Sequence, residues 1–120
     1  MFKYYNNNPM SLKEQDCVTR AISLASGYGY NQIRDKLHYV GELLECEKLC
    51  VCCYKHLLDK VFEYPRLRCV GMTVGEVVKE HPDDTLLIRI EGHLTCAKNG
   101  EIRDLWDCSN EYVDIVWKII

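Results

Sequence analysis

Apolar residues recur at helical spacing in the first half of the chain and at strand spacing in the second half. Asp16 can cap a helix that begins at Cys17, and Gly27 with Gly29 ends that helix. The apolar stripe of this helix consists of Val18, Ala21, Ile22 and Ala25. Residues repeating in this way lie on one helix face, so the stripe predicts a buried side. The polar residues 1–15 predict a loop or a loose arm.

The pattern next predicts two further helical stretches, a short strand and a short capped helix. Asn31 can cap a second helix, and Leu49–Tyr64 suits a third. The stripe of the second helix is Ile33, Leu37, Val40 and Leu44. Arg66–Val70 is suited to a short strand. Thr73 and Glu76 have the spacing of a capping box, so a short helix is expected to begin there.

From position 85 onward the pattern changes to short apolar or alternating runs, which are typical of strands. The predicted strands are Thr85–Ile90, His93–Lys98, Glu101–Asp107 and Tyr112–Ile119. Asn99-Gly100 is a strong hairpin signal, because both residues accept the positive φ angles of a tight turn. Helices first and strands afterwards predict a single α+β domain over residues 1–120, in which N-terminal helices pack on a C-terminal antiparallel β-meander.

The composition excludes several classes of protein. A length of 120 residues suits one domain, and 15 basic against 18 acidic residues give a net charge of −3. A nucleic-acid-binding surface needs a basic patch, which these scattered charges do not supply. No apolar run approaches the ~20 residues of a membrane span, and no signal peptide opens the chain. We therefore expect a cytoplasmic protein that binds neither nucleic acid nor a membrane.

Eight cysteines stand at positions 17, 46, 50, 52, 53, 69, 96 and 108. We expect them as thiols, because disulfides are rare in the reducing cytosol. Cys46, Cys50 and Cys53 repeat along one helix face, which favours core packing. With Cys52 and His56 the stretch holds enough ligands for zinc. These last two fall on a different helical stripe, however, so four ligands would not converge, and we predict no metal.

Cys17 differs from the other cysteines because it stands in the expected first turn of a helix. There, unpaired backbone N–H groups and the positive end of the helix dipole favour the thiolate, which is the nucleophilic form. The same N–H groups can hold an oxyanion. A nucleophile also needs a base, and the base needs a group that orients it. The candidates are His93 for the base, with Asp104 and Asp107 on the returning strand.

The hairpin register decides which aspartate faces His93. A two-residue turn at Asn99-Gly100 places Asp104 on the face of His93. A three-residue loop, with Gly100 in the left-handed region, places Asp107 there instead. The dipeptide suits both loops, so the residues themselves leave both aspartates open.

Two short blocks of the chain resemble the papain-like cysteine peptidase superfamily. The first is Gln15-Asp16-Cys17-Val18-Thr19-Arg20-Ala21. The second comprises Gly92-His93-Leu94-Thr95, Asn99-Gly100 and Asp104-Leu105-Trp106-Asp107. The second block is similar to small peptidase-like proteins of bacteriophages and prophages, and the layout is similar to that of the leader peptidases of bacteriocin exporters. The resemblance spans about residues 14–119.

This resemblance implies a papain-like fold, a thiol nucleophile at Cys17 and a general base at His93. The family places its aspartate where the returning strand ends, which favours Asp107 as the third member, with Asp104 as the alternative. Papain-like enzymes use a glutamine several residues before the cysteine to hold the oxyanion. Gln15 is the nearest match, at two residues before the cysteine. No metal or organic cofactor is implied.

The expected function is a small cysteine-dependent hydrolase, a peptidase or related amide-bond hydrolase. It would act on a protein or peptide substrate through an acyl-enzyme, and a phage or prophage would encode it. The alternative is a non-catalytic papain-like interaction protein, such as a phage-encoded inhibitor of a host protein. An unreactive Cys17 would favour that alternative.

Overall fold

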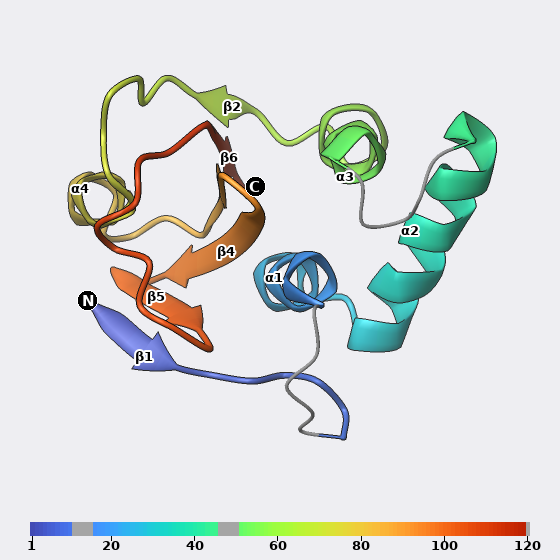
Figure 1. The fold of residues 1–120 in the computed structure, drawn as a ribbon, viewed down its shortest axis with the longest axis horizontal. Helices are drawn as coiled ribbons and strands as arrows, with labels where there is room; N and C mark the ends of the chain where they lie inside the picture. Colours follow the sequence, from blue (N-terminus) through green and yellow to red (C-terminus); the bar gives the residue numbers. More distant parts are fainter. Residues whose placement is uncertain (11–15, 46–50, 120) are drawn as a thin grey trace.

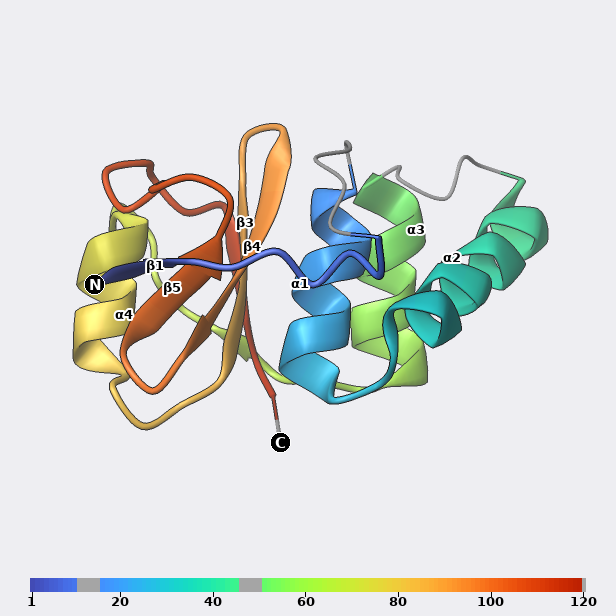
Figure 2. The ribbon, with the colours of Figure 1, turned by 90° about the horizontal axis from the view of Figure 1, so that it is seen from below.

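A central sheet separates two layers of helices in the computed structural model, which describes residues 1–10, 16–45 and 51–119. Helix α4 covers one face of the sheet, while α1 and α3 lie on the other face, with α2 outside them (Figure 1 and Figure 2). This is an α+β fold, as the order of the patterns predicts. No helix in the described part of the chain has the length and apolar character needed to cross a membrane.

The described residues form four α-helices, one π-helical segment and six strands. The helices are α1 (Cys17–Ser26), α2 (Tyr30–Leu44), α3 (Val51–His56) and α4 (Val74–Glu80), and the π-helical segment η1 (Leu57–Val61) continues α3. The strands are β1 (Phe2–Tyr4), β2 (Arg66–Leu67), β3 (Leu86–Ile90), β4 (His93–Lys98), β5 (Glu101–Asp104) and β6 (Ile115–Lys118).

The sheet is mixed, which corrects the expected antiparallel meander. Its strand order is β1-β5-β4-β3-β6-β2. Strands β3, β4 and β5 do form consecutive antiparallel pairs, but β6 returns to the free side of β3, and β1 runs parallel to β5. The sequence could not indicate β1, because a three-residue strand is too short to display a period. Part of the expected N-terminal arm is therefore an edge strand.

Both faces of the sheet are buried, each under its own apolar core. The larger core joins α1, α2, α3 and η1 to one face of the sheet, where Leu87, Leu94 and Trp117 are fully buried. The second core joins α4 to the other face, where Ile88 and Val116 are fully buried. Burial on both sides explains why β6 alternates poorly in polarity, and it holds the strands rigidly behind any site at their ends.

The helix starts follow the sequence with one exception. Helix α1 begins at Cys17 as predicted, although the Asp16 side chain makes no capping hydrogen bond. Thr73 and Glu76 form the expected capping box, with Thr73 Oγ1 accepting from Glu76 N at 3.2 Å. Helix α2 begins one residue before Asn31, the expected cap, because the Gln32 side chain instead accepts the Gly29 N–H at 2.8 Å.

The hairpin between β4 and β5 has the two-residue form of the turn. Lys98 pairs with Glu101, and Asn99 and Gly100 have φ angles of 51° and 75°. Both angles are positive, as a type I′ turn requires. The register continues to Cys96, which lies opposite Arg103. Of the two registers open from the sequence, this is the one that brings Asp104 to the face of His93.

Candidate active site

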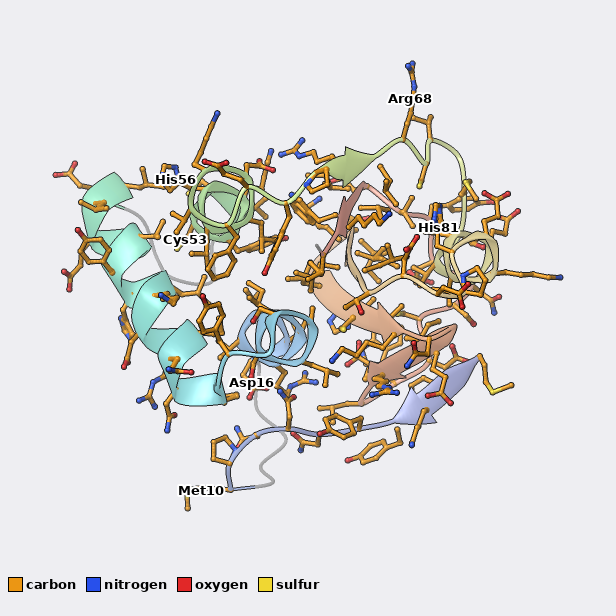
Figure 3. All side chains as sticks on the ribbon, turned by 180° about the vertical axis from the view of Figure 1, so that it is seen from behind. Met10, Asp16, Cys53, His56, Arg68 and His81 are labelled. Carbon is orange, nitrogen blue, oxygen red and sulfur yellow. The ribbon has the colours of Figure 1, made fainter. Side chains whose placement is uncertain are left out.

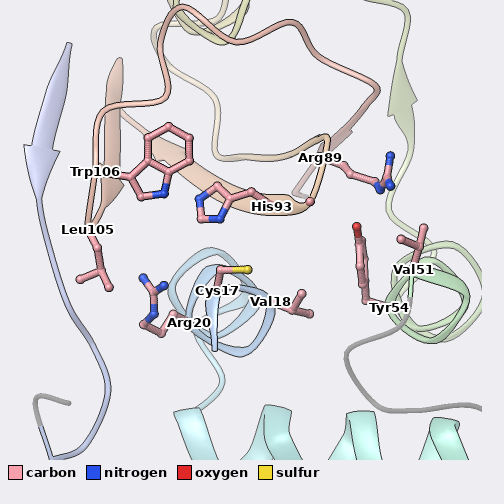
Figure 4. Close-up of a pocket in the computed structure, with 10 residues that line it drawn as sticks. Cys17, Val18, Arg20, Val51, Tyr54, Arg89, His93, Leu105 and Trp106 are labelled. Carbon is pink, nitrogen blue, oxygen red and sulfur yellow. The ribbon is translucent and has the colours of Figure 1, made fainter. Parts of the chain in front are cut away.

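A thiol, an imidazole and a carboxylate meet where α1 begins beside the ends of β4 and β5. Cys17 is the first residue of α1 and is partly exposed, and His93 is the first residue of β4. The two side chains face each other in a cavity of about 520 Å³ (Figure 4). The sequence block that begins the helix and the block that begins the strand are therefore brought together, as expected.

The carboxylate that reaches His93 belongs to Asp104, the last residue of β5. Asp104 Oδ2 lies 2.6 Å from His93 Nε2, and the side chains are 3% and 10% exposed. The other carboxylate oxygen accepts the Leu105 backbone N–H at 2.7 Å. A short, buried contact of this kind is a charge-assisted hydrogen bond, which fixes the imidazole ring in orientation.

Asp107, which the resemblance favoured, does not lie at His93. Its carboxylate is exposed and accepts the Ser109 backbone N–H at 3.0 Å, in a turn. The two-residue turn at Asn99-Gly100 is the reason, because it sets the even positions of β5 on the face of His93. The alternative aspartate, Asp104, therefore completes the group in place of Asp107.

The environment of Cys17 favours its thiolate. Burial raises the pKa of the thiol, but hydrogen bonds from the His93 imidazole and the Leu94 backbone N–H act in the opposite direction. The positive charges of His93 and Arg20 act with these hydrogen bonds. The net result is a Cys17 pKa below its ordinary value, which increases the fraction of nucleophilic thiolate at a given pH.

The pKa of the His93 imidazole shifts in the opposite direction, to a higher value. Burial lowers the pKa of His93, but hydrogen bonds to Asp104 and Cys17, and then their negative charges, outweigh it and raise the pKa to about 9. Burial raises the pKa of Asp104, but the hydrogen bond with His93, the charge of His93 and the further hydrogen bonds together outweigh it, so this pKa lies below its ordinary value. The raised pKa of His93 makes the imidazolium its main form at neutral pH, and the lowered pKa values of Cys17 and Asp104 favour a thiolate and an ionised carboxylate beside it.

A buried ionic network supports Asp104 from the side of α1. Arg20 Nη1 lies 3.3 Å from Asp104, and Arg20 Nε lies 2.6 Å from Asp16. Asp16 also accepts hydrogen bonds from Tyr30 at 2.6 Å and from Asn8 at 3.0 Å. The network thus links the N-terminal segment and α2 to the site. Asp16 and Arg20 stand four residues apart, the spacing of a helical ion pair, which is the signal that could have revealed it.

Trp106 covers the outer side of the imidazole. The centroids of the Trp106 and His93 rings are 5.1 Å apart, and the ring planes are inclined at 44°. The indole is half-exposed and lines the cavity. Its ring packs beside the imidazole at the edge of the cavity. The sequence showed Trp106 only as part of the second block, without a role.

A second thiol, that of Cys108, lies close to the same pair. The ligand atoms of Cys108, His93 and Asp104 lie within 4.8 Å of one another. Burial, and then the Asp104 charge, raise the pKa of Cys108 to about 12, so this thiol keeps its proton. A metal ion here would have to displace that proton and break the bond between His93 and Asp104. The cluster therefore suits a hydrogen-bonded group better than a metal centre.

The other expected residues fall elsewhere or outside the described residues. Gln15, the expected oxyanion residue, and Cys46 and Cys50 of the cysteine-rich stretch are not among the described residues. On α3, Cys53 is fully buried, with its thiol 3.2 Å from the Leu37 carbonyl oxygen, whereas Cys52 is exposed. Figure 3 marks Cys53 on this helix. Of these two adjacent cysteines, Cys53 packs in the core, as its helical spacing from Cys46 and Cys50 predicts.

None of the family models, curated proteins or solved structures compared with the chain matches it. The geometry of the site must therefore carry the functional argument.

Proposed function

We propose that this protein is a small cysteine-dependent hydrolase that cleaves amide bonds through an acyl-enzyme. The observation that carries the proposal is the row formed by Cys17, His93 and Asp104 at the edge of an open cavity. Its three members come from α1, β4 and β5, three elements anchored in the buried cores. The pKa of each member is shifted in the direction that favours nucleophilic catalysis: lowered for Cys17 and Asp104, and raised to about 9 for His93.

In the first step the Cys17 thiolate attacks the carbonyl carbon of the substrate, and a carbon–sulfur bond forms as the carbonyl π electrons move to oxygen. The resulting oxyanion lies near the start of α1, where the Cys17 backbone N–H has no partner within the helix. A preorganised N–H donor of this kind stabilises the charge that develops in the transition state.

In the second step the His93 imidazolium gives its proton to the leaving nitrogen, the carbon–nitrogen bond breaks, and a thioester remains on Cys17. Water then attacks the thioester while His93 accepts a proton from that water, and the thiolate leaves. Asp104 keeps the ring oriented and stabilises its charged form, and it need not accept a proton itself.

The papain-like assignment, the phage or prophage origin and the cytoplasmic location are parts of the same proposal. They rest on the sequence resemblance, and the α+β arrangement with a helix-borne thiol opposite a strand-borne imidazole supports the first of them. A domain of 120 residues leaves little surface for specificity pockets. We therefore propose a protein or peptide as the substrate, which can supply contacts beyond the cavity.

The test is residue-resolved alkylation by iodoacetamide across pH, read by mass spectrometry. In the unaltered protein Cys17 should react faster than every other cysteine below about pH 7, because its thiolate is stabilised. In His93→Ala this advantage should disappear, and the reaction should follow an ordinary thiol with a pKa of about 8.5.

His81→Ala is the matched control. His81 also has a carboxylate partner, with Nδ1 3.1 Å from Asp84, but it lies at the end of α4, away from the cavity (Figure 3). This variant should leave the profile of Cys17 unchanged. A Cys17 that reacts no faster than Cys52 in the unaltered protein would overturn the proposal and favour the non-catalytic interaction protein.

A further inference from the structure

The cavity extends beyond the thiol to a second, cationic end formed by Arg89 of β3 and Tyr54 of α3 (Figure 4). We propose that this end binds a carboxylate on the acyl part of the substrate, so that the enzyme prefers acidic acyl donors. The inference rests on the proposed function, and it names the substrate class for that same site.

The guanidinium of Arg89 lines the cavity, and not all of its N–H groups are paired among the described residues. Its Nη1 pairs with Asp114, but its Nε is buried and has no hydrogen-bond partner among the described residues. A guanidinium presents five N–H donors in a fixed fork, and a buried donor left unpaired is unfavourable. A carboxylate is the group that this fork matches best, since it can accept two parallel N–H bonds.

The charges around the cavity favour an anion. Ten of the described residues line it, and none of these ten is an aspartate or a glutamate. Arg20, another cation in the lining, is already paired with two buried carboxylates. The carboxylate of Asp114 is 55% exposed and does not line the cavity. Among the described lining residues, Arg89 differs from Arg20 in that its carboxylate partner is exposed, so a ligand can compete with Asp114 for the guanidinium.

Tyr54 adds a neutral donor at the same end. Its side chain is buried in the larger core, and its hydroxyl points toward the Arg89 guanidinium (Figure 4). Burial raises the pKa of Tyr54, and the nearby Arg89 only partly opposes the shift. The hydroxyl consequently stays protonated at neutral pH and can donate a hydrogen bond to an anion.

The cationic end of the cavity should contact the acyl half of the substrate, because it lies on the opposite side of Cys17 from His93 (Figure 4). Cys17 lies between His93 with Trp106 on one side and Tyr54 with Arg89 on the other (Figure 4). The leaving nitrogen must lie beside the imidazolium that protonates it. The acyl group therefore extends toward Arg89. A carboxylate there has two sources: the side chain of Asp or Glu, or the α-carboxylate of a γ-glutamyl group.

The test uses chloromethyl ketones, whose ketone carbonyl occupies the place of the scissile carbonyl while Cys17 displaces chloride. One pair compares N-acetylglutamyl with N-acetylglutaminyl chloromethyl ketone. The other compares 2-acetamido-6-chloro-5-oxohexanoate, which carries the α-carboxylate of a γ-glutamyl group, with its primary amide. The measured quantity is the ratio of Cys17 labelling rates, charged over neutral reagent, in each pair. Because both reagents meet the same thiolate, this ratio cancels any change in the pKa of Cys17.

In the unaltered protein we expect a ratio of about fivefold or more for at least one pair, and that pair identifies the source of the carboxylate. In Arg89→Gln the ratio should fall to near one. Arg68→Gln, which removes an exposed arginine after β2 (Figure 3), should leave it unchanged. A second variant, Asp114→Asn, frees Arg89 from its partner and should raise the ratio.

Equal ratios in the unaltered protein and in Arg89→Gln, with Cys17 still labelled rapidly, would overturn this inference and leave the proposed function intact. A ratio that fails to rise in Asp114→Asn also counts against it, and this variant does not depend on the folding of the arginine variant. If instead no reagent labels Cys17 faster than the exposed Cys52, both proposals fail together.

Discussion

Two thiols flank the same imidazole–carboxylate pair, and their pKa values move in opposite directions. Cys17 faces His93, and its pKa is lowered in spite of burial. Cys108 lies close to Asp104, and burial, followed by that negative charge, raises its pKa to about 12. Cys96, in the core between the sheet and α1, reaches about 12 through burial above all.

The difference between the two thiols comes from which partner each one faces. A thiolate beside the imidazolium gains a hydrogen bond and an opposite charge, whereas a thiolate beside the carboxylate meets a like charge in a poorly solvated site. The two cysteines have the same chemistry in isolation, so their roles follow from position. The pair of His93 and Asp104 therefore activates one thiol and silences the other.

The largest expected effect comes from exchanging the two thiols for alanine, one at a time. Cys17→Ala should reduce hydrolysis of p-nitrophenyl acetate by at least about a thousandfold, because the nucleophile is lost. Cys108→Ala should change the same rate by less than about threefold, since its protonated thiol takes no part. Release of p-nitrophenolate measures both. Comparable losses in the two variants would mean that the two thiols do not differ in role.

The next largest effect concerns Arg20, which pairs with the carboxylate of Asp104. Arg20→Gln should lower the free energy of unfolding by about 3 kcal/mol, because it leaves the buried Asp16 carboxylate without a cation and removes one of the two cationic partners of Asp104. Arg68→Gln removes an exposed arginine and should change it by less than about 0.5 kcal/mol. Urea unfolding followed by tryptophan fluorescence measures the difference.

Arg20→Gln should also reduce the difference in pKa between the thiols of Cys17 and Cys108. The positive charge of Arg20 lowers the pKa of Cys17, so its removal should move the onset of Cys17 alkylation to higher pH. An unchanged onset in a folded variant would show that Arg20 acts on stability alone.

A smaller effect concerns the dependence of the hydrolysis rate on pH. The reactive pair requires Cys17 deprotonated and His93 protonated, so the rate should rise with pH through the lowered pKa of Cys17 and fall near pH 9 as the imidazolium loses its proton. Asp104 holds the pKa of His93 up. Asp104→Asn should therefore move the falling limb to lower pH and reduce the maximal rate by about tenfold.

Asp107→Asn is the matched control for that experiment. Asp107 is an exposed aspartate three residues further along the chain, and its contact is with the Ser109 backbone. This variant should keep both the falling limb and the maximal rate of p-nitrophenyl acetate hydrolysis. A shift of the limb in Asp107→Asn rather than in Asp104→Asn would restore the aspartate that the resemblance favoured.

The local features of the fold were predictable where a few adjacent residues decide them. The start of α1 at Cys17, the capping box at Thr73 and the tight turn at Asn99-Gly100 each depend on neighbouring backbone and side-chain groups. The parallel edge strand β1 and the return of β6 beside β3 depend on pairing between distant segments. Short strands carry no signal for their partners, so these two features were not predictable.

For the site itself, the sequence by itself determined the candidates: a cysteine at a helix start, a histidine at a strand start and two aspartates on the returning strand. Only the tertiary structure decided between the aspartates, because a change of one residue in the turn reverses which face each side chain occupies. It also decided the cationic end at Arg89, whose neighbours come from α3 and from the loop before β6. Local chemistry is set by adjacent residues, whereas charge, burial and pairing at a site are set by segments that meet only after folding.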